Sequence, residues 1–234
     1  MNNAIIIFMA LLPVAILLSY IYHKDKYKPE PVGKLIKTFT FGVVSIFVSL
    51  CISSQFEKWG LFSESSDSFW TGVSSSFWGA AIPEEVAKFA MFWLAIRNNT
   101  HFDEKMDGIV YAVCVSLGFA AFENILYLFT YIENAAFVGV ARAIFSVPGH
   151  FCFGILMGYY YSLAKFYQFN KRKHMALTLA APILAHGIYN SLLSVSNVGV
   201  GISFLLMVAF IYFCYKLWKH ASKSIQDHIQ RDIY

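Results

Sequence analysis

The chain has 234 residues, of which 58% are hydrophobic, 18% are aromatic and only 14% are charged, with a formal net charge of +4. A water-soluble domain has about one quarter charged residues, and the apolar residues here stand in long runs, so an ordinary soluble protein is excluded. The composition predicts an all-α, polytopic transmembrane helical bundle surrounded by the lipid bilayer, and no nucleic-acid partner is expected.

Seven stretches of the chain have roughly the 20 residues that a helix needs to cross the hydrocarbon core. In chain order they are 3–22, 35–53, 69–96, 107–129, 137–164, 175–195 and 199–218. The third and fifth are longer than one crossing requires, and Pro83 is the expected position of a break in the third. We therefore expect one transmembrane domain at 1–220 with a motif-bearing core at 70–195, followed by a short cytoplasmic tail at 221–234.

Charges in the connecting loops predict how the seven spans are oriented. The loops at 23–34, 97–106 and 165–174 and the C-terminal tail are rich in lysine and arginine, whereas the intervening loops are acidic or neutral. Basic loops stay on the cytoplasmic side of a membrane. This alternation predicts an N-terminus outside and a C-terminus in the cytoplasm.

Ionisable and amide side chains stand inside four of the predicted spans, where each charged group costs about 2.5–3.5 kcal/mol at a helix centre. They are Glu84, Glu85 and Lys88 in the third span, Glu123 and Asn124 in the fourth, Arg142 and His150 in the fifth, and His186 and Asn190 in the sixth. The summed cost is on the order of 15 kcal/mol, comparable to the folding free energy of a whole domain. Mutual pairing, a metal or a water-filled cavity must offset this cost, and the similar depths predict that these groups converge.

Helical spacing predicts some of the contacts within this polar group. Glu84 and Lys88 are four residues apart and share a helix face, whereas Glu85 points about 100° away. The two glutamates therefore need not share one role. His186 and Asn190 are also four residues apart, so the Asn190 amide is expected to orient the imidazole.

Two histidines and a glutamate form a known catalytic zinc set, which leaves one coordination position for water. The predicted zinc ligands are Glu123, His150 and His186. Glu84 or Glu85 would then be the base that takes a proton from that water. A metal-free mechanism stays open, in which a desolvated glutamate activates water directly while a histidine or an arginine stabilises the oxyanion.

Two other functions also fit a buried polar cluster. A proton-coupled transporter uses glutamates and histidines as a relay, although this chain is short and shows none of the internal repeats that carriers have. A non-catalytic membrane scaffold uses such groups as structural contacts between helices. A lone histidine or a lone Glu–Lys pair is more often structural, so a hydrolytic site is inferred from the conjunction of all these groups on four successive spans.

Four short motifs in these spans resemble those of a known family. They are Glu84-Glu85-Val86-Ala87-Lys88, Phe119-Ala120-Ala121-Phe122-Glu123-Asn124 with Tyr127, the stretch from Arg142 to His150, and His186-Gly187 with Asn190. Together they resemble the PrsW family of bacterial membrane proteases, which is related to the CAAX-protease and bacteriocin-processing superfamily. The first motif alone is a weak signal, and the resemblance rests on all four motifs occurring in order between residues 80 and 190.

The resemblance implies an intramembrane endopeptidase of the bacterial cytoplasmic membrane that cleaves a single-pass, membrane-anchored substrate. The role implied by the family is the first, site-1 cut of an anti-sigma factor in envelope-stress signalling. Carried over residue by residue, the catalytic residues are Glu84 and Glu85, the residues that complete a zinc site are Glu123, His150 and His186, and the supporting residues are Lys88, Asn124, Arg142 and Asn190. The fourth motif often ends in Asp, and Asn190 stands in that place, where it accepts a hydrogen bond but adds no charge.

Overall fold

Every element of the protein that the structure describes is helical. The computed structural model describes residues 2–25, 28–63, 68–194 and 200–233, with the backbone alone at 200–207 and 233. The helices are α1 (Asn3–Lys24), α2 (Val32–Lys58), α3 (Phe69–Ser74), α4 (Ile82–Ile96), α5 (Lys105–Thr130), α6 (Ala135–Ala141), α7 (Val147–Phe166), α8 (Lys171–Ser194) and α9 (Val200–Ile233), with π-helical segments η1 (Ser75–Ala81) and η3 (Arg142–Ser146) and a 3-10 turn η2 (Ile132–Asn134). The all-α prediction is confirmed.

The described helices have the length and composition of membrane spans. Five of them are long and apolar enough to cross a bilayer: α1, α2, α5, the run Ile132–Phe166 and α8. The third predicted span is the continuous run α3–η1–α4, and the seventh lies within α9 except for Gly199, which is outside the described residues. The polytopic bundle is therefore confirmed, and both overlong spans contain a π-helical segment.

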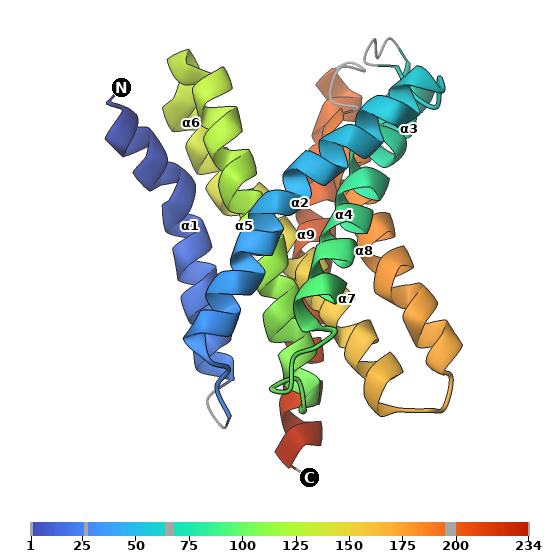
Figure 1. The fold of residues 1–234 in the computed structure, drawn as a ribbon. Coiled ribbons are helices and arrows are strands. Elements are labelled where there is room, and N and C mark those ends of the chain that lie inside the picture. The colour runs from blue at the N-terminus through green and yellow to red at the C-terminus, as the bar shows by residue number, and fades with distance from the viewer. Residues whose placement is uncertain (1, 26–27, 64–67, 195–199, 234) are drawn as a thin grey trace.

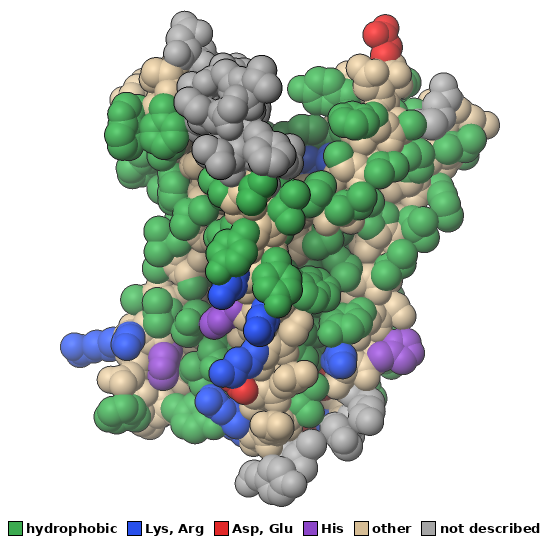
Figure 2. Space-filling model, turned by 180° about the vertical axis from the view of Figure 1, so that it is seen from behind, with side chains coloured by type: hydrophobic (Ala, Val, Ile, Leu, Met, Phe, Trp, Pro, Cys, Tyr) green, Lys and Arg blue, Asp and Glu red, His purple; other side chains and the backbone are tan. Residues whose placement is uncertain are grey.

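The basic segments of the chain lie together at one end of the bundle. Figure 1 shows the α1–α2, α4–α5 and α7–α8 connections and the C-terminus at the lower end, opposite the N-terminus. Most of the Lys and Arg side chains visible in Figure 2 lie in the lower half of that face, below a surface covered by hydrophobic side chains. The spans thus alternate in direction as predicted, and the cytoplasmic location of the lower end remains a prediction.

The irregularity in the third span lies just before Pro83, the residue at which a break was expected. The π-helical segment η1 occupies Ser75–Ala81, and Pro83 falls in the first turn of α4. Proline has no N–H to donate to the carbonyl four residues earlier, which is that of Gly79. The Ser53 hydroxyl of α2 donates to this carbonyl instead, at 2.7 Å. A neighbouring helix therefore satisfies the group that the proline leaves free.

Helix α5 is the buried centre of the bundle and packs against α1, α2 and α7. Its approach to α7 is close because glycines face each other: a Cβ at Gly158 would lie 2.2 Å from the carbonyl oxygen of Gly108. Gly42 of α2 meets the Val115 carbonyl in the same way, at 2.1 Å. Small residues allow this contact between membrane helices, and Gly154 of α7 likewise lies against α5, where its Cβ would be 3.0 Å from the Cα of Val113.

The C-terminal part of α9 packs along the lower end of the bundle. The helix continues to Ile233, and Ala221, Ile225 and His228 are buried. The Asp232 carboxylate accepts the backbone N–H groups of Lys105 and Met106, at 2.9 and 2.8 Å. The end of the chain thus caps the start of α5.

Candidate active site

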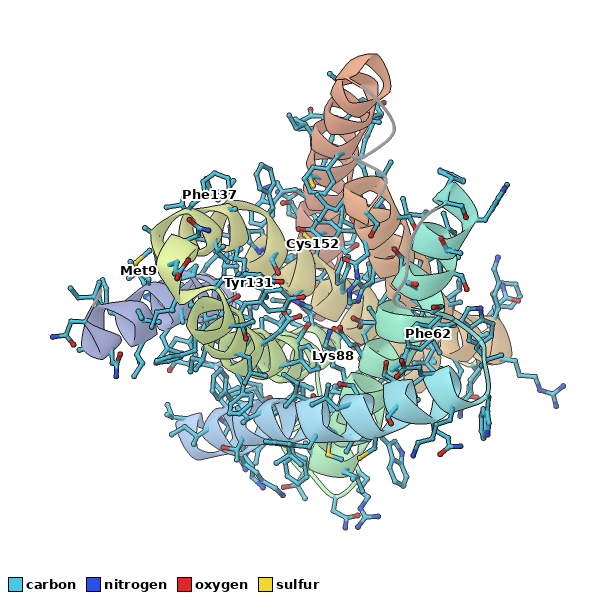
Figure 3. All side chains as sticks on the ribbon, turned by 90° about the horizontal axis from the view of Figure 1, so that it is seen from above. Met9, Phe62, Lys88, Tyr131, Phe137 and Cys152 are labelled. Atoms are coloured by element: carbon cyan, nitrogen blue, oxygen red, sulfur yellow. The ribbon has the colours of Figure 1, made fainter. Side chains whose placement is uncertain are left out.

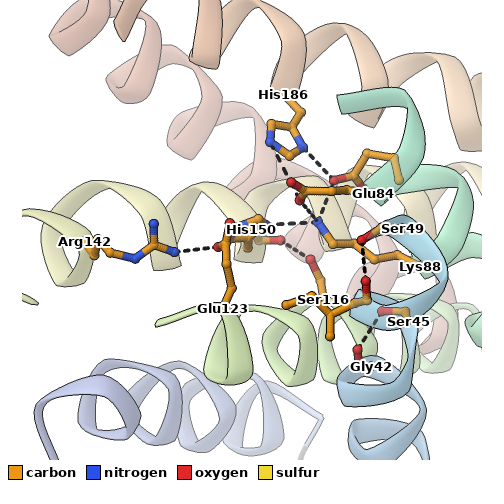
Figure 4. Close-up of polar contacts among 12 residues, drawn as sticks. Gly42, Ser45, Ser49, Glu84, Lys88, Ser116, Glu123, Arg142, His150 and His186 are labelled. Carbon is orange, nitrogen blue, oxygen red and sulfur yellow. Dashed lines mark hydrogen bonds and ion pairs between the residues drawn. The ribbon is translucent and has the colours of Figure 1, made fainter. Parts of the chain in front are cut away.

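Four helical runs bring the predicted polar residues to one place inside the bundle. Figure 3 shows Lys88 of α4 near the middle of the bundle when it is viewed from above, and Figure 4 shows the residues that gather around it. Glu84 and Glu85 come from α4, Glu123 from α5, Arg142 and His150 from the η3–α7 run, and His186 from α8. The predicted convergence is therefore observed.

Glu85 is the most deeply enclosed carboxylate of the site, with 0% of its side chain exposed. Its Oε1 accepts from Lys88 Nζ at 2.9 Å and lies 2.9 Å from His186 Nδ1. Because a carboxylate only accepts hydrogen bonds, Nδ1 of His186 carries a hydrogen, and Nε2 of the neutral ring has the lone pair. Nε2 lies 4.0 Å from Glu84 Oε2. Glu85 thus sets the tautomer of His186, a role that the sequence interpretation gave to Asn190.

A second carboxylate–imidazole pair lies on the other side of Lys88. Glu123 Oε2 is 3.0 Å from His150 Nε2 and accepts from Arg142 Nη2 at 2.5 Å. Arg142 Nε also donates to Asn124 Oδ1, at 2.6 Å. Arg142 therefore holds both members of the Glu-Asn motif, which explains why an arginine and an amide accompany the glutamate.

Lys88 joins the two pairs. Its Nζ donates to Glu84 Oε2 at 3.2 Å and lies 3.1 Å from His150 Nδ1 (Figure 4). An ammonium group can only donate, so Nδ1 of His150 accepts and its Nε2–H is directed at Glu123. The cation is also 4.0 Å from the centre of the Phe119 ring. The Glu84–Lys88 contact expected from their spacing is present, and the contacts to His150 and Phe119 add to it.

A cavity of about 310 Å³ opens beside these groups. Its wall includes Glu84, Glu123, Arg142, His150, His186 and Asn190. Glu84 has 15% of its side chain exposed, whereas Glu85 has none and does not line the cavity. The two adjacent glutamates therefore occupy different environments, one facing the cavity and one behind it.

The nitrogen and oxygen atoms of the site form two groups that could hold a metal ion. Glu84, Glu123 and His150 form one group, and Glu84, Glu85 and His186 form the other, with ligand atoms within 4.8 Å of one another in each. The two imidazole rings have centroids 5.6 Å apart. The predicted ligands thus fall into both groups, and Glu84 belongs to each of them.

Several residues of the site were not assigned from the sequence. Phe153 stacks on His186 with ring centroids 4.8 Å apart, and Ser116 donates to the His150 carbonyl at 2.6 Å. Neither has a charge that would mark it inside an apolar span. Gly187 carries a packing signal, because a Cβ there would lie 2.2 Å from the ring of Phe77 in η1. These residues fix the helices and rings that carry the polar groups.

Comparison with known proteins identifies relatives over most of the chain. Residues 30–215 match the family described as PrsW family intramembrane metalloprotease. The chain is 41% identical over 185 residues to "Protease PrsW" of Oceanobacillus iheyensis, covering 77% of this chain and 79% of the relative. It is 38% identical to "Protease PrsW" of Bacillus subtilis, covering 81% and 83%, and 32% identical to that of Clostridioides difficile, covering 95% and 92%. No solved structure matches the chain.

Proposed function

We propose roles in peptide hydrolysis for the site residues of this chain, which belongs to the PrsW family of intramembrane metalloproteases and is a multi-pass protein of the bacterial cell membrane. Glu84 is the general base, Glu85 is a positioning residue, and His150, His186 and Glu123 hold a zinc ion. The assignment of different roles to the two glutamates rests on the cavity, because Glu84 lines it and Glu85 does not.

The donor types present suit a catalytic zinc ion, and Glu123 and His150 must move toward His186 to surround one ion, because these ligands fall into two separate groups. Imidazole nitrogens and carboxylate oxygens are the donor set of such sites, and Glu85 supplies the carboxylate behind a ligating histidine that usually fixes its orientation. The Glu85 Oε2 atom is buried and has no hydrogen-bond partner among the described residues, so this carboxylate has spare capacity to accept. When bound, zinc lowers the pKa of a coordinated water and polarises the peptide carbonyl.

Two residues in the cavity wall can act on the peptide itself. The carboxylate of Glu84 takes a proton from the attacking water and passes it to the leaving amine. The guanidinium of Arg142, which also lines the cavity, donates to the peptide oxygen as negative charge develops there.

Lys88 and Glu85 prepare the site without touching the peptide. Lys88 donates to both glutamates and offsets one of their two negative charges, while Glu85 holds the hydrogen on Nδ1 of His186, so that Nε2 is the ligating nitrogen of the neutral ring. His150 is arranged differently, because its Nε2–H points at Glu123. Ligation through this nitrogen requires the hydrogen to move to Nδ1, so Lys88 then donates to the two glutamates alone.

The depth of the site supports a substrate cut toward the extracytoplasmic side. Glu123 lies about 10 Å from the end of α5 at Thr130 and about 27 Å from its start at Lys105, at 1.5 Å per residue. His186 is likewise nearer the end of α8 at Ser194 than its start. With the basic loops in the cytoplasm, this position fits site-1 cleavage of a single-pass anti-sigma factor in stress signalling.

The test is cleavage of a single-pass membrane protein by the purified chain in zinc-loaded liposomes. Glu84→Gln is expected to lower the cleavage rate by about 10²–10⁴-fold, because the amide cannot accept the proton. Glu133→Gln, an exposed carboxylate in the turn after α5, is the matched control. Equal cleavage by the folded Glu84→Gln variant and the wild type would contradict the assignment, and a cut on the cytoplasmic side would contradict the substrate proposal.

A further inference from the structure

A second group of carboxylates lies at the lower end of the bundle, away from the candidate active site. Asp25 follows α1, and Glu104 and Asp107 stand at the start of α5. One oxygen from each of these three residues lies within 4.8 Å of the others. Asp107 and Glu123 are both on α5, about 24 Å apart along the helix axis. The two groups therefore cannot share one ion.

Two of these carboxylates are buried and incompletely bonded. Asp25 is 4% exposed and Asp107 is 1% exposed. Asp107 Oδ2 accepts the backbone N–H groups of Asp103 and Glu104, at 2.9 and 2.7 Å, which fixes the carboxylate and leaves Oδ1 for the cluster. Among the described residues, no N–H or O–H group donates to Asp25 Oδ2 or Asp107 Oδ1, and both atoms are shielded from solvent. The Glu30 carboxyl lies within hydrogen-bond reach of the Asp107 carboxyl, so these two groups share a proton unless a cation takes its place. Buried acceptors of this kind are expected to have a ligand.

Among the described residues, two of the nearby lysines pair with other carboxylates, and Lys165, whose charge acts on Asp107 from a distance, donates to the Phe102 carbonyl. Lys28 pairs with Asp103 at 2.6 Å and is 3.9 Å from Glu104, and Lys105 pairs with Asp232 at 3.1 Å. In the described part of the chain no salt bridge reaches Asp25 or Asp107.

We propose that Asp25, Glu104 and Asp107 bind a hard divalent cation, Mg²⁺ or Ca²⁺. Ligands that are all oxygen favour these ions over zinc or copper. Ca²⁺–O distances of about 2.3–2.6 Å allow two ligand oxygens to lie up to about 5.2 Å apart, and the three oxygens here all lie within 4.8 Å of one another.

The cation would have a structural role. It joins the end of α1 to the first turn of α5, the buried centre of the bundle. Asp232 of α9 caps the same turn of α5 from another side. Three segments that are distant in sequence are thus fastened at one point, and the cation would stabilise the end of the bundle opposite the cavity.

The experiment measures binding of Ca²⁺ and of Mg²⁺ to the purified, chelator-stripped full chain in detergent, by calorimetry and thermal unfolding. Asp25→Asn and Asp107→Asn remove charge with little change in shape, and asparagine can still accept the N–H bonds that Asp107 receives. Glu57→Gln, an exposed carboxylate at the end of α2, is the matched control. Glu84→Gln reports whether the ion goes to the candidate active site instead.

The proposal predicts one saturable site that raises the unfolding temperature of the wild type, the Glu57→Gln variant and the Glu84→Gln variant. Each Asn variant should bind at least about tenfold more weakly, since affinity follows the charge of the ligands. Absence of binding by the wild type up to about 10 mM of either ion, above the range of weak Ca²⁺ sites, would overturn the proposal. So would undiminished binding by Asp25→Asn, or loss of binding in Glu84→Gln alone. If both Asn variants fail to fold, the wild type and Glu84→Gln still decide, because the proposal requires equal binding by these two proteins.

Discussion

Replacing Lys88 by methionine is expected to lower the free energy of unfolding by about 3–5 kcal/mol in the metal-free protein. The Lys88 side chain is 1% exposed, and its ammonium lies 2.9 Å from Glu85 and 3.2 Å from Glu84. Methionine keeps much of the apolar volume against Phe119 but leaves the fully buried Glu85 without a cation. The magnitude follows because removing one partner of a buried ion pair leaves the full desolvation penalty of the other.

The assay is denaturant or thermal unfolding in detergent with a chelator present, for the single variant and for Lys88→Met combined with Glu85→Gln. The double variant removes the stranded charge, so it should recover a large part of the loss. Lys58→Met, at an exposed position on α2, is the control for loss of one lysine. A Lys88→Met variant within about 0.5 kcal/mol of the wild type would refute the reasoning, because that is the range of ordinary surface substitutions.

Three further predictions follow from other contacts. Glu85→Gln should weaken zinc binding by about 10–100-fold while excess zinc restores cleavage, because its contact with His186 orients a ligand; cleavage lost at every zinc concentration would make Glu85 a catalytic residue. Gly158→Val should destabilise the protein by about 1–3 kcal/mol in thermal unfolding, because its Cβ would lie 2.2 Å from a carbonyl oxygen of α5. Gly33→Val is the control, since a Cβ at Gly33 meets open space. Equal losses of stability in the two variants would contradict the prediction. Burial raises the pKa of Asp25 to about 7, so between about pH 4 and pH 7 the folded protein in chelator binds a proton that the unfolded chain has lost. The free energy of unfolding should therefore fall as the pH rises through this range. The same dependence of stability on pH in Asp25→Asn and the wild type would contradict the prediction.

Much of the fold could be predicted because the thickness of the bilayer sets the length of each apolar run. Loop charge then indicated where each run turns, and the basic segments do lie at one end of the bundle (Figure 1). The break in the third span was less predictable. Pro83 indicates the approximate position of the break, but the π-helical segment precedes it. The Ser53 hydroxyl that donates to the Gly79 carbonyl comes from another helix. Such a contact depends on how helices pack, which one span does not reveal.

The residues of the candidate site could be predicted from the energetic cost of polar groups in lipid. Which of these residues contact one another across different helices could not. The Glu84–Lys88 contact follows from helical spacing alone. The contact of Glu85 with His186 depends on the rotation of α8 against α4, which the sequence interpretation could not specify. The acidic cluster around Asp25 gave no signal, because carboxylates near basic loops are usually solvated and these become buried only when α1 meets α5.

The central claim is that peptide hydrolysis occurs at this site and depends on a metal. The most direct measurement is cleavage of a single-pass substrate in liposomes by the chelator-stripped chain, with bound zinc determined on the same preparation during a zinc titration. The account predicts no cleavage without metal, recovery in proportion to zinc bound, and no recovery in the Glu84→Gln variant. Full cleavage by protein shown to contain no metal would contradict it and would favour direct activation of water by a glutamate.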